Sequence, residues 1–235
     1  MITIENLRKA YGKLQVLKDI NVSFGAGKVV SVIWPNGSGK TTMSKCILGM
    51  ALPDSGDIKL NGESILKKHA YRSQIGYMPQ IGKYPENMKI RQVIDMIRDI
   101  RKDVTTIDEE LIGLYGLEKM YDKRMGALSG GTKQKVSAAL AFMFNPHILI
   151  LDEPTAGLDP ISSEILKCKI LKEKKRGKLI LITSHIMSEI EEVADEVMCL
   201  VDGQVKFHET IAGIKMQANE ERLSRAIAKV MNEED

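Results

Sequence analysis

The sequence lacks any apolar run long enough to cross a bilayer. Its longer apolar stretches, residues 138–144 and 148–151, fall far short of the roughly 20 residues that a membrane-spanning helix needs. The first residues have neither a basic start followed by an apolar core nor an Arg-rich amphipathic pattern. We therefore expect no transmembrane helix, no export or organelle signal, and a cytosolic chain.

Cysteine is scarce and charge is nearly balanced. The three cysteines, Cys46, Cys168 and Cys199, form no Cys-x-x-Cys pair, which favours buried apolar thiols over a disulfide framework or a zinc site. The 34 basic and 31 acidic residues leave a net charge of +3, which is too weak to indicate nucleic-acid binding. With 43% hydrophobic residues, the 235-residue chain can bury a substantial core.

Three apolar runs have the composition of buried strands. Residues 29–33 are β-branched and almost wholly apolar, and residues 147–151 and 179–182 repeat this pattern, which is typical of parallel strands covered on both faces. A helical pattern over 161–175 separates the last two. Strands that alternate with helices predict an α/β core with a parallel sheet, and the alternating first thirty residues predict a small antiparallel β region before it.

The middle of the chain differs from this core. Residues from about 85 to 127 contain no strong strand pattern, and we expect an inserted α-helical subdomain over about 85–145. Near the end, Asp202-Gly203 between two apolar runs predicts a hairpin. We expect one domain over 1–217 and a charged helical tail over 218–235, for which packing on its own domain is a simpler explanation than regulation.

A glycine-rich loop follows the first buried strand. Strand, loop, Gly-Lys-Thr and helix in this order are the context of a P-loop, because backbone N–H groups at a helix N-terminus attract phosphate. Lys40 would supply a mobile charge for the β- and γ-phosphates, and the Thr41 hydroxyl a magnesium ligand. The residues expected to bind nucleotide here are Asn36, Gly37, Ser38, Gly39, Lys40, Thr41 and Thr42.

One position departs from the P-loop pattern. Trp34 stands where a glycine is expected, five residues before Gly39. Because it precedes Pro35, it is biased toward extended backbone, which tryptophan can adopt; positive φ would instead cost about 1–2 kcal/mol. Two outcomes stay open: the indole packs harmlessly, or it impairs nucleotide binding.

Polar residues that suit hydrolysis follow the other two strands. Asp152 and Glu153 come directly after the strand at 147–151, and ligands of parallel sheets gather at strand C-termini. Asp152 can bind the magnesium shell, while Glu153 can polarise the attacking water. His185 follows the third strand, where it could contact the γ-phosphate.

A second glycine-rich element precedes a helix expected over 133–144. Ser129, Gly130 and Gly131 would form another anion-binding helix terminus. Since one nucleotide rarely needs two such cradles from one chain, we expect this element to close over nucleotide held by a second copy, in a two-fold dimer.

These elements, in this order, resemble the nucleotide-binding subunit of an ABC transporter over residues 1–213. The Walker A element matches residues 35–42, the Q-loop 77–80, Walker B 148–153, the D-loop 156–159 and the switch histidine His185. The signature resembles residues 128–134, with Thr132 where Gln is common. Tyr11 falls where the family stacks an aromatic ring on adenine.

The resemblance implies an ATP-hydrolysing motor with a P-loop NTPase fold that uses ATP and Mg²⁺. It implies catalytic roles for Glu153, His185, Gln80 and Lys40, and magnesium ligands at Thr41, Gln80 and Asp152. It also implies transmembrane permease subunits and a second copy as partners, at the cytoplasmic face of the membrane, with no nucleic acid. Residues 84–88, after the Q-loop, are our expected docking surface for the membrane subunit.

The direction of transport and the class of machine follow from smaller signals. The chain ends soon after the hairpin, which favours an exporter over a sugar importer, and residues 77–81 and 84–88 are similar to the ATPase of the nitrous oxide reductase (copper) maturation transporter. A soluble ABC protein of repair or translation is disfavoured because only 129 − 80 = 49 positions separate Gln80 from Ser129. The other alternative is a nucleotide-binding regulatory subunit in which Trp34 impairs hydrolysis.

Overall fold

The structure, a computed structural model, describes residues 1–33 and 40–232, the side chains of Lys40 and Asn232 excepted. The chain divides into two compact units. Unit 1 comprises residues 1–73 and 179–235, and unit 2 comprises residues 74–178. Each unit is described by itself.

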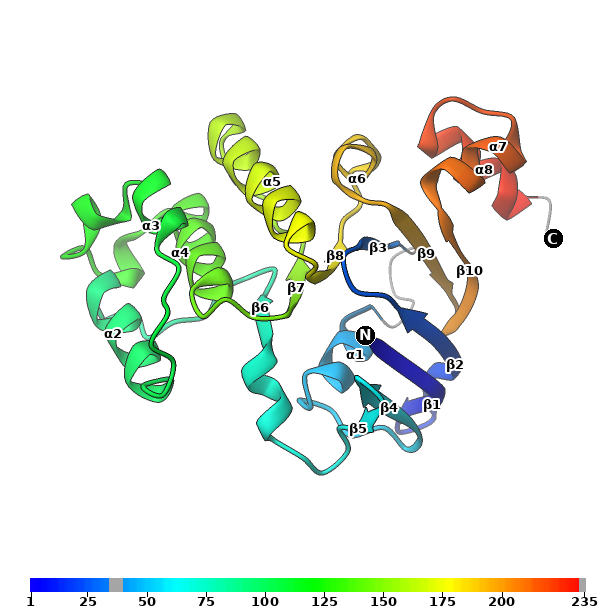
Figure 1. Ribbon diagram of the computed structural model, residues 1–235, viewed down its shortest axis with the longest axis horizontal. Helices are drawn as coiled ribbons and strands as arrows, with labels where there is room; N and C mark the ends of the chain where they lie inside the picture. Colours follow the sequence, from blue (N-terminus) through cyan, green and yellow to red (C-terminus); the bar gives the residue numbers. More distant parts are fainter. Residues whose placement is uncertain (34–39, 233–235) are drawn as a thin grey trace. The chain divides into compact units, whose positions relative to one another are not determined.

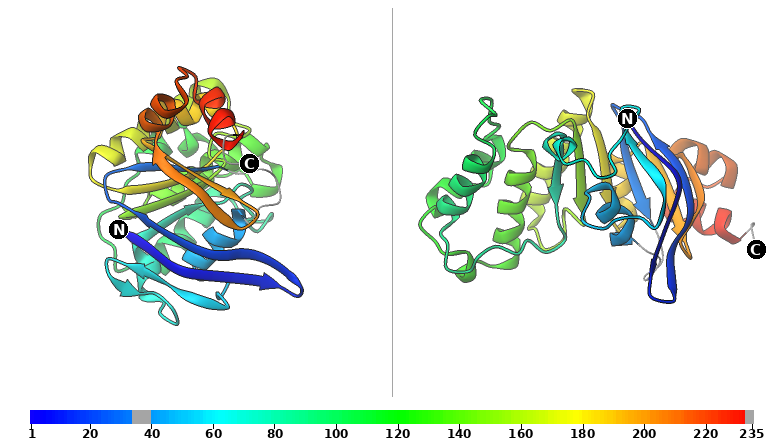
Figure 2. Two further views of the ribbon diagram at one scale, coloured as in Figure 1. Left: turned by 90° about the vertical axis from the view of Figure 1, so that its right-hand side faces the viewer. Right: turned by 90° about the horizontal axis from the view of Figure 1, so that it is seen from below.

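Unit 1 contains an antiparallel sheet of four strands in the order β2-β1-β4-β5. Its strands are β1 (Ile2–Tyr11), β2 (Leu14–Phe24), β4 (Ser55–Leu60) and β5 (Glu63–Ser64). Alternating buried residues Ile2 and Ile4 give β1 one apolar face, and Figure 2 shows the long β1–β2 ribbon. The antiparallel region expected at the N-terminus is confirmed. Gly56 has a φ of +87°, and a Cβ there would lie 2.3 Å from the Asn6 carbonyl oxygen, so β4 requires glycine.

A second sheet in unit 1 places β3 (Val29–Ile33) between two parallel neighbours, β8 (Leu179–Thr183) and β9 (Glu196–Val201). Every residue of β3 and β8 is buried, as the continuous apolar runs predicted. The strand β10 (Gln204–Thr210) pairs antiparallel with β9 in the expected hairpin. Helices α1 (Lys40–Ile47) and α6 (Met187–Val193) follow β3 and β8.

Two C-terminal helices belong to unit 1. The first, α7 (Ile211–Ala218), begins at Thr210, whose hydroxyl accepts from the Gly213 N–H, and ends at Asn219 with left-handed backbone. The second, α8 (Leu223–Asn232), buries residues in a cluster with residues of β3 and β9. Figure 1 shows α7 and α8 next to each other after β10. The tail therefore packs on its own unit over its described residues, through α8. The residues that α8 contributes to this cluster are Leu223, Ala226, Ile227 and Val230.

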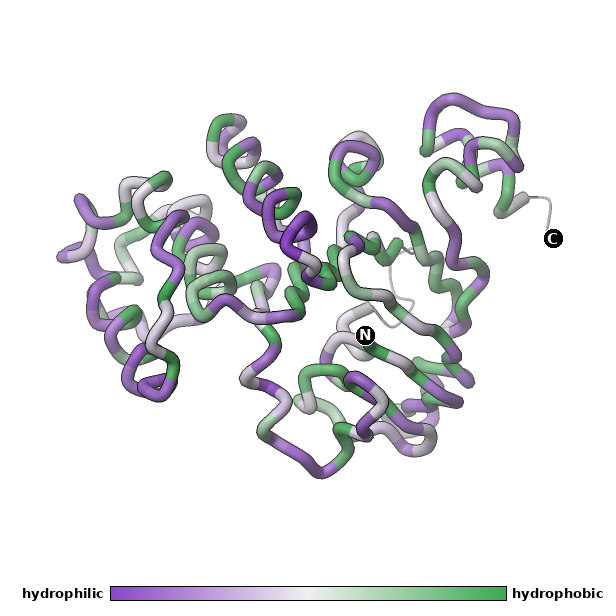
Figure 3. Tube along the Cα trace, viewed as in Figure 1, coloured by the Kyte–Doolittle hydropathy of each residue, from purple (hydrophilic) through white to green (hydrophobic). Residues whose placement is uncertain are grey.

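Unit 2 contains the parallel strand pair β6 (Ile75–Met78) and β7 (Ile148–Asp152). Its helices are α2 (Ile90–Ile100), α3 (Glu110–Leu114), α4 (Gly130–Phe142) and α5 (Pro160–Lys175). Short 3-10 turns of unit 2 lie at Leu117–Met120 and Met125–Ala127, whereas the turn Ala70–Gln74 belongs to unit 1 except for its last residue. Hydrophilic and hydrophobic stretches alternate along α5 (Figure 3), as expected of a helix with one buried face.

The fold class predicted from the sequence is confirmed: an α/β protein with parallel strand pairs, an N-terminal antiparallel region and helices within residues 85–145. Among the described residues, no helix combines the length and the apolar character that crossing a bilayer requires. The domain boundaries expected at residue 217 and around 85 and 145 stay predictions.

Candidate functional site

The residues expected to form the site fall in both units. Unit 1 carries Tyr11, Lys40, Thr41, Thr42 and His185, and unit 2 carries Gln80, Ser129, Gly130, Gly131, Asp152 and Glu153. The expected residues Asn36, Gly37, Ser38 and Gly39, together with Trp34, lie outside the described residues. The two open outcomes for Trp34 therefore both stand.

In unit 1, the end of β3 and the start of α1 bracket the P-loop. The strand ends at Ile33 and the helix begins at Lys40, so a strand precedes and a helix follows the glycine-rich segment, as expected of this element. Thr41 is exposed in the first turn of α1, whereas Thr42 is buried. No acidic residue lies in this turn, so the first N–H groups of the helix keep their attraction for an anion.

His185 lies at the same edge of the sheet as this helix start. Val32 of β3 is in register with Thr183 of the parallel strand β8. The residues that follow the two strands therefore leave the sheet at the same edge, the one formed by the strands' C-terminal ends. His185 is exposed two residues beyond Thr183. The Ser184 hydroxyl accepts from the Ile186 N–H at 3.1 Å and holds the turn that presents the histidine.

Tyr11, at the end of β1, is 50% exposed and is therefore not a core residue. The ammonium of Lys9 lies 5.4 Å from the centroid of its ring and is also bonded to Asp54 at 2.8 Å. The hydrogen bond to Asp54 raises the pKa of Lys9, so the lysine stays charged. An exposed, cation-flanked ring offers a surface on which a base can stack.

In unit 2, β6 and β7 present the residues that are expected to serve in hydrolysis at one edge. Met78 is in register with Leu151, so Gln80 and Glu153, each two residues further on, leave the sheet at the same end. Glu153 is 4% exposed and has a φ of 48°, a left-handed backbone that is uncommon for residues other than glycine. Backbone of this kind clusters at active sites.

Asp152 lies half-buried at the end of β7. Burial raises the pKa of Tyr77 on the neighbouring strand β6, and the charge of Asp152 raises it further. The carboxylate therefore acts within a partly desolvated region, where charge interactions are stronger than in water.

Ser129 caps α4. Its Oγ accepts from the Thr132 N–H at 3.3 Å and lies 2.9 Å from the Thr132 Oγ1. Gly130 and Gly131 are the first residues of the helix, and no acidic residue lies in its first turn. The helix expected from residue 133 thus begins three residues earlier, because the serine cap satisfies a terminal N–H.

The same helix contacts the segment around the expected D-loop. A Cβ on Gly131 would lie 2.5 Å from the carbonyl oxygen of Gly157, and Lys135 bonds to Asp159 at 2.8 Å. Asp159 also caps α5 by accepting from the Ser162 N–H at 2.9 Å. The hydrogen bond from Lys135, and those from Ser162, lower the pKa of Asp159. Sequence reasoning did not single out Lys135.

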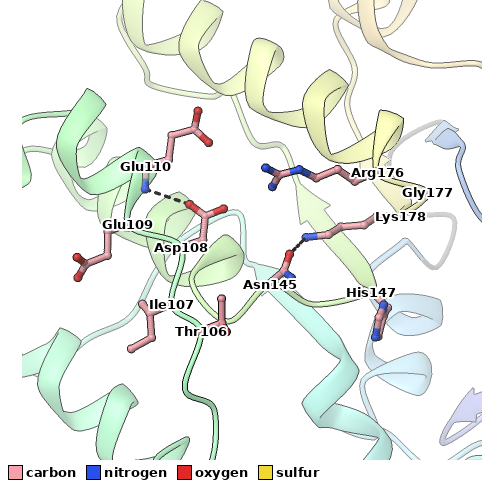
Figure 4. Close-up of a pocket in the computed structure, with 10 residues that line it drawn as sticks. All are labelled: Thr106, Ile107, Asp108, Glu109, Glu110, Asn145, His147, Arg176, Gly177 and Lys178. Atoms are coloured by element: carbon pink, nitrogen blue, oxygen red, sulfur yellow. Dashed lines mark hydrogen bonds between the residues drawn. The ribbon is translucent and has the colours of Figure 1, made fainter.

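A pocket of about 560 Å³ in unit 2 is lined by none of the expected site residues. Figure 4 shows Asp108 and Lys178 approaching it from opposite sides. Its charged groups are bonded within the chain: Lys178 to Asn145 at 2.6 Å, Arg176 to Glu173 at 2.7 Å, and Asp108 to Lys169 at 2.5 Å. A ligand would have to break these bonds, so the charges stabilise unit 2 rather than form a binding site.

The fold and these positions define a P-loop ATPase, with a helix that begins at the lysine of Gly-Lys-Thr, paired carboxylates at a strand end and a serine-capped glycine helix. The family model described as "ABC transporter" matches residues 17–156, more than half of the chain. The chain belongs to the ABC transporter family. It is the ATP-binding subunit of such a transporter, and it is an ATPase.

Among curated proteins, the chain is 33% identical over 222 residues to the Nod factor export ATP-binding protein I of Ralstonia nicotianae, covering 90% of this chain and 68% of that protein. It is also 33% identical over 213 residues to the lipopolysaccharide export system ATP-binding protein LptB of Haemophilus influenzae, covering 87% and 88%. The names of both relatives describe ATP-binding proteins of export systems.

Among solved structures, an ATP-binding subunit of an ABC transporter superposes with a TM-score of 0.88 at 26% identity, over 98% of this chain and 99% of that one. A dimeric ATP-binding cassette in a post-hydrolysis state, bound to ADP and Pi, superposes with a TM-score of 0.78 at 23% identity, over 89% and 98%. This second likeness concerns the fold alone.

Proposed function

We propose that this chain powers export through separate transmembrane subunits, working as a dimer in which each copy closes over ATP held by the other. The observation that carries the proposal is the second anion-binding terminus, Ser129-Gly130-Gly131 at the start of α4. The export systems named for its relatives support the direction. The place of action would be the cytoplasmic face of the membrane.

In this function, the residues divide into phosphate, metal and water contacts. Lys40 and His185 contact the γ-phosphate, and the N–H groups at the start of α1 hold the remaining phosphate oxygens. Thr41, Gln80 and Asp152 suit Mg²⁺, because their side chains offer oxygen donors. Mg²⁺, when bound, neutralises phosphate charge, and Glu153 polarises the attacking water.

The dimer is tested in a variant that binds ATP without turnover. We expect Glu153→Gln to elute at twice the monomer mass when ATP is added and at the monomer mass with ADP. Adding Ser129→Ala should abolish this shift, because it removes a phosphate contact. The measurement is size-exclusion chromatography with light scattering.

Ser129→Ala also removes the N-cap of α4, so the control is a variant that loses the N-cap of another helix. Thr210→Ala removes the N-cap of α7, which costs about as much stability as the loss of Ser129, ~1 kcal/mol. It should leave the ATP-driven dimer intact. A dimer that persists in Ser129→Ala would contradict the role of this helix terminus.

A groove of about 290 Å³ in unit 2 offers a docking surface for a transmembrane subunit. Ile97 and Ile100 of α2 line it, and Ile100 is 69% exposed. Tyr84, the first residue of the expected docking segment 84–88, also lines it, and its hydroxyl lies 2.8 Å from the Ser137 Oγ of α4. We propose that an apolar side chain of an amphipathic helix of that subunit fills this groove.

Placing a charge in the groove tests this docking. We expect Ile100→Glu to lose at least tenfold in co-purification with the transmembrane subunit that the wild-type chain recovers from its own membranes, because docking would desolvate the new carboxylate. Leu114→Glu, which places the same charge on an exposed leucine of α3 outside the groove, should co-purify normally. Equal recovery of both variants would reject the groove.

Two narrower proposals differ in the cargo that is transported. Residues 77–81 and 84–88 favour a transporter of the nitrous oxide reductase (copper) maturation kind, whereas the relatives are named for Nod factor and lipopolysaccharide export. The identity of the co-purifying transmembrane subunit distinguishes them. A non-transport ABC machine would yield no such partner.

A further inference from the structure

One face of α4 is packed against the segment 153–159 that follows β7. Gly131, Gln134 and Lys135 have the i, i+3, i+4 spacing that places side chains on one side of a helix. They meet, respectively, the carbonyl oxygen of Gly157, the carbonyl oxygen of Glu153 and the carboxylate of Asp159. A single helix face thus contacts both ends of this segment.

The central contact of this face is made by a buried amide. Gln134 is 4% exposed, and its Nε2 donates to the Glu153 carbonyl oxygen at 3.3 Å. Since a carbonyl oxygen only accepts, the amide nitrogen must face it. A buried amide is costly unless it is bonded, so this side chain has a specific partner rather than a general packing role.

The residue that receives this bond has an uncommon backbone. Glu153 has a φ of 48° and is 4% exposed. Left-handed backbone at a residue with a Cβ persists only where its surroundings hold it. The Glu153 carbonyl oxygen accepts from two donors, the Gln134 amide and the Ala156 N–H at 3.1 Å. Rotation of the peptide group after Glu153 would break both bonds and turn the adjoining backbone of Glu153, which directs its carboxylate.

We infer that Gln134 is a positioning residue for Glu153: its amide, together with the Ala156 N–H, holds the left-handed turn that aims the carboxylate at the attacking water. This inference rests on the proposed role of Glu153. Because α4 begins at Ser129, the helix that meets nucleotide of a second copy also holds the hydrolytic turn. Lys135 and Gly131 keep the rest of the segment against the same face.

The first test removes only the donor. Gln134→Met keeps the length and unbranched shape of the side chain, and we expect kcat for ATP hydrolysis to fall about 10–100-fold, since small misplacements of reacting groups have effects of this size. KM for ATP should stay within about threefold, because ATP binding does not use this amide. Gln217→Met, the same change at an exposed position of α7, should leave kcat unchanged.

The second test separates positioning from a merely structural role. In Gln134→Glu, an ionised carboxylate faces a carbonyl oxygen and cannot donate, whereas the protonated acid can. Burial raises the pKa of such a group, so kcat relative to wild type should rise as the pH falls from 8 toward 6. Gln134→Met should show no such recovery.

A double variant completes the design. Adding Gln134→Met to Glu153→Gln should lower the residual turnover no further, because the amide acts through Glu153. Wild-type kcat in Gln134→Met, or a pH profile of Gln134→Glu that follows wild type, would overturn the inference alone. Wild-type turnover in Glu153→Gln would instead show that the proposed function has the wrong base.

Discussion

Steady-state phosphate release is expected to fall by about 10²–10⁴-fold in Glu153→Gln, the range that a positioned general base supplies. Glutamine keeps the shape of the side chain and the left-handed backbone of this buried residue, but it cannot take a proton from water. Nucleotide affinity should persist within a few-fold, since the amide does not repel phosphate. A malachite green assay and a fluorescent-nucleotide titration measure the two effects.

The matched control changes a carboxylate of no expected function. Glu118 is exposed at the start of a 3-10 turn in unit 2, and Glu118→Gln should hydrolyse ATP at the wild-type rate. Phosphate release that survives in Glu153→Gln would mean that another group polarises the water. Loss of nucleotide binding in that variant would point to a structural defect instead.

Unfolding should require about 3 kcal/mol less free energy in Lys169→Met, because breaking a buried ion pair leaves charge uncompensated. The Lys169 side chain is 1% exposed, and its ammonium lies 2.5 Å from Asp108, 2.7 Å from Glu110 and 3.0 Å from the fully buried Glu173. Lys178, 2.5 Å from Glu173, still compensates that carboxylate and limits the loss. Urea unfolding at pH 7 measures the change.

An exposed lysine beside the same network is the control. Lys172 bonds to Glu110 at 2.7 Å, but its side chain is 47% exposed. Lys172→Met should cost at most about 1 kcal/mol, as pairs open to water do. Equal losses in the two variants would show that burial does not decide the strength of this network.

The loss of stability in Lys169→Met should depend on pH in a defined direction. Hydrogen bonds from Lys169 and Lys172 lower the pKa of Glu110 to about 2. Burial alone would raise the pKa of Glu173, but hydrogen bonds from Lys178 and Lys169 lower it overall. A carboxylate whose pKa is lowered by folding makes its full contribution to stability at pH values above its ordinary pKa of 4.5. That contribution is lost as the pH falls toward 2 and the carboxylate is protonated. The difference in free energy of unfolding between wild type and Lys169→Met, measured in urea, should therefore be smaller at low pH than at pH 7.

Strands buried on both faces were predictable from the sequence. The strands β3, β7 and β8 are almost wholly apolar runs, and short runs of this kind are compatible with few structures other than a buried strand. The short strands β4 and β5 were not, since half or more of their residues are polar or glycine. They are ordered by pairing, β4 with β1 and β5 with β4. Helix α7 also escaped prediction, because its cap, Thr210, is the last residue of a strand.

The sequence by itself determined the chemistry of this ATPase: the Gly-Lys-Thr helix start, the carboxylates after a buried strand and the capping serine of α4 are local patterns with local physical causes. Only the tertiary structure decided how that chemistry is supported. Gln134 meets Glu153 across 19 positions, and Lys169 meets Asp108 across 61. Such bonds depend on chain segments that approach only when the core forms, so spacing along the sequence carries no sign of them.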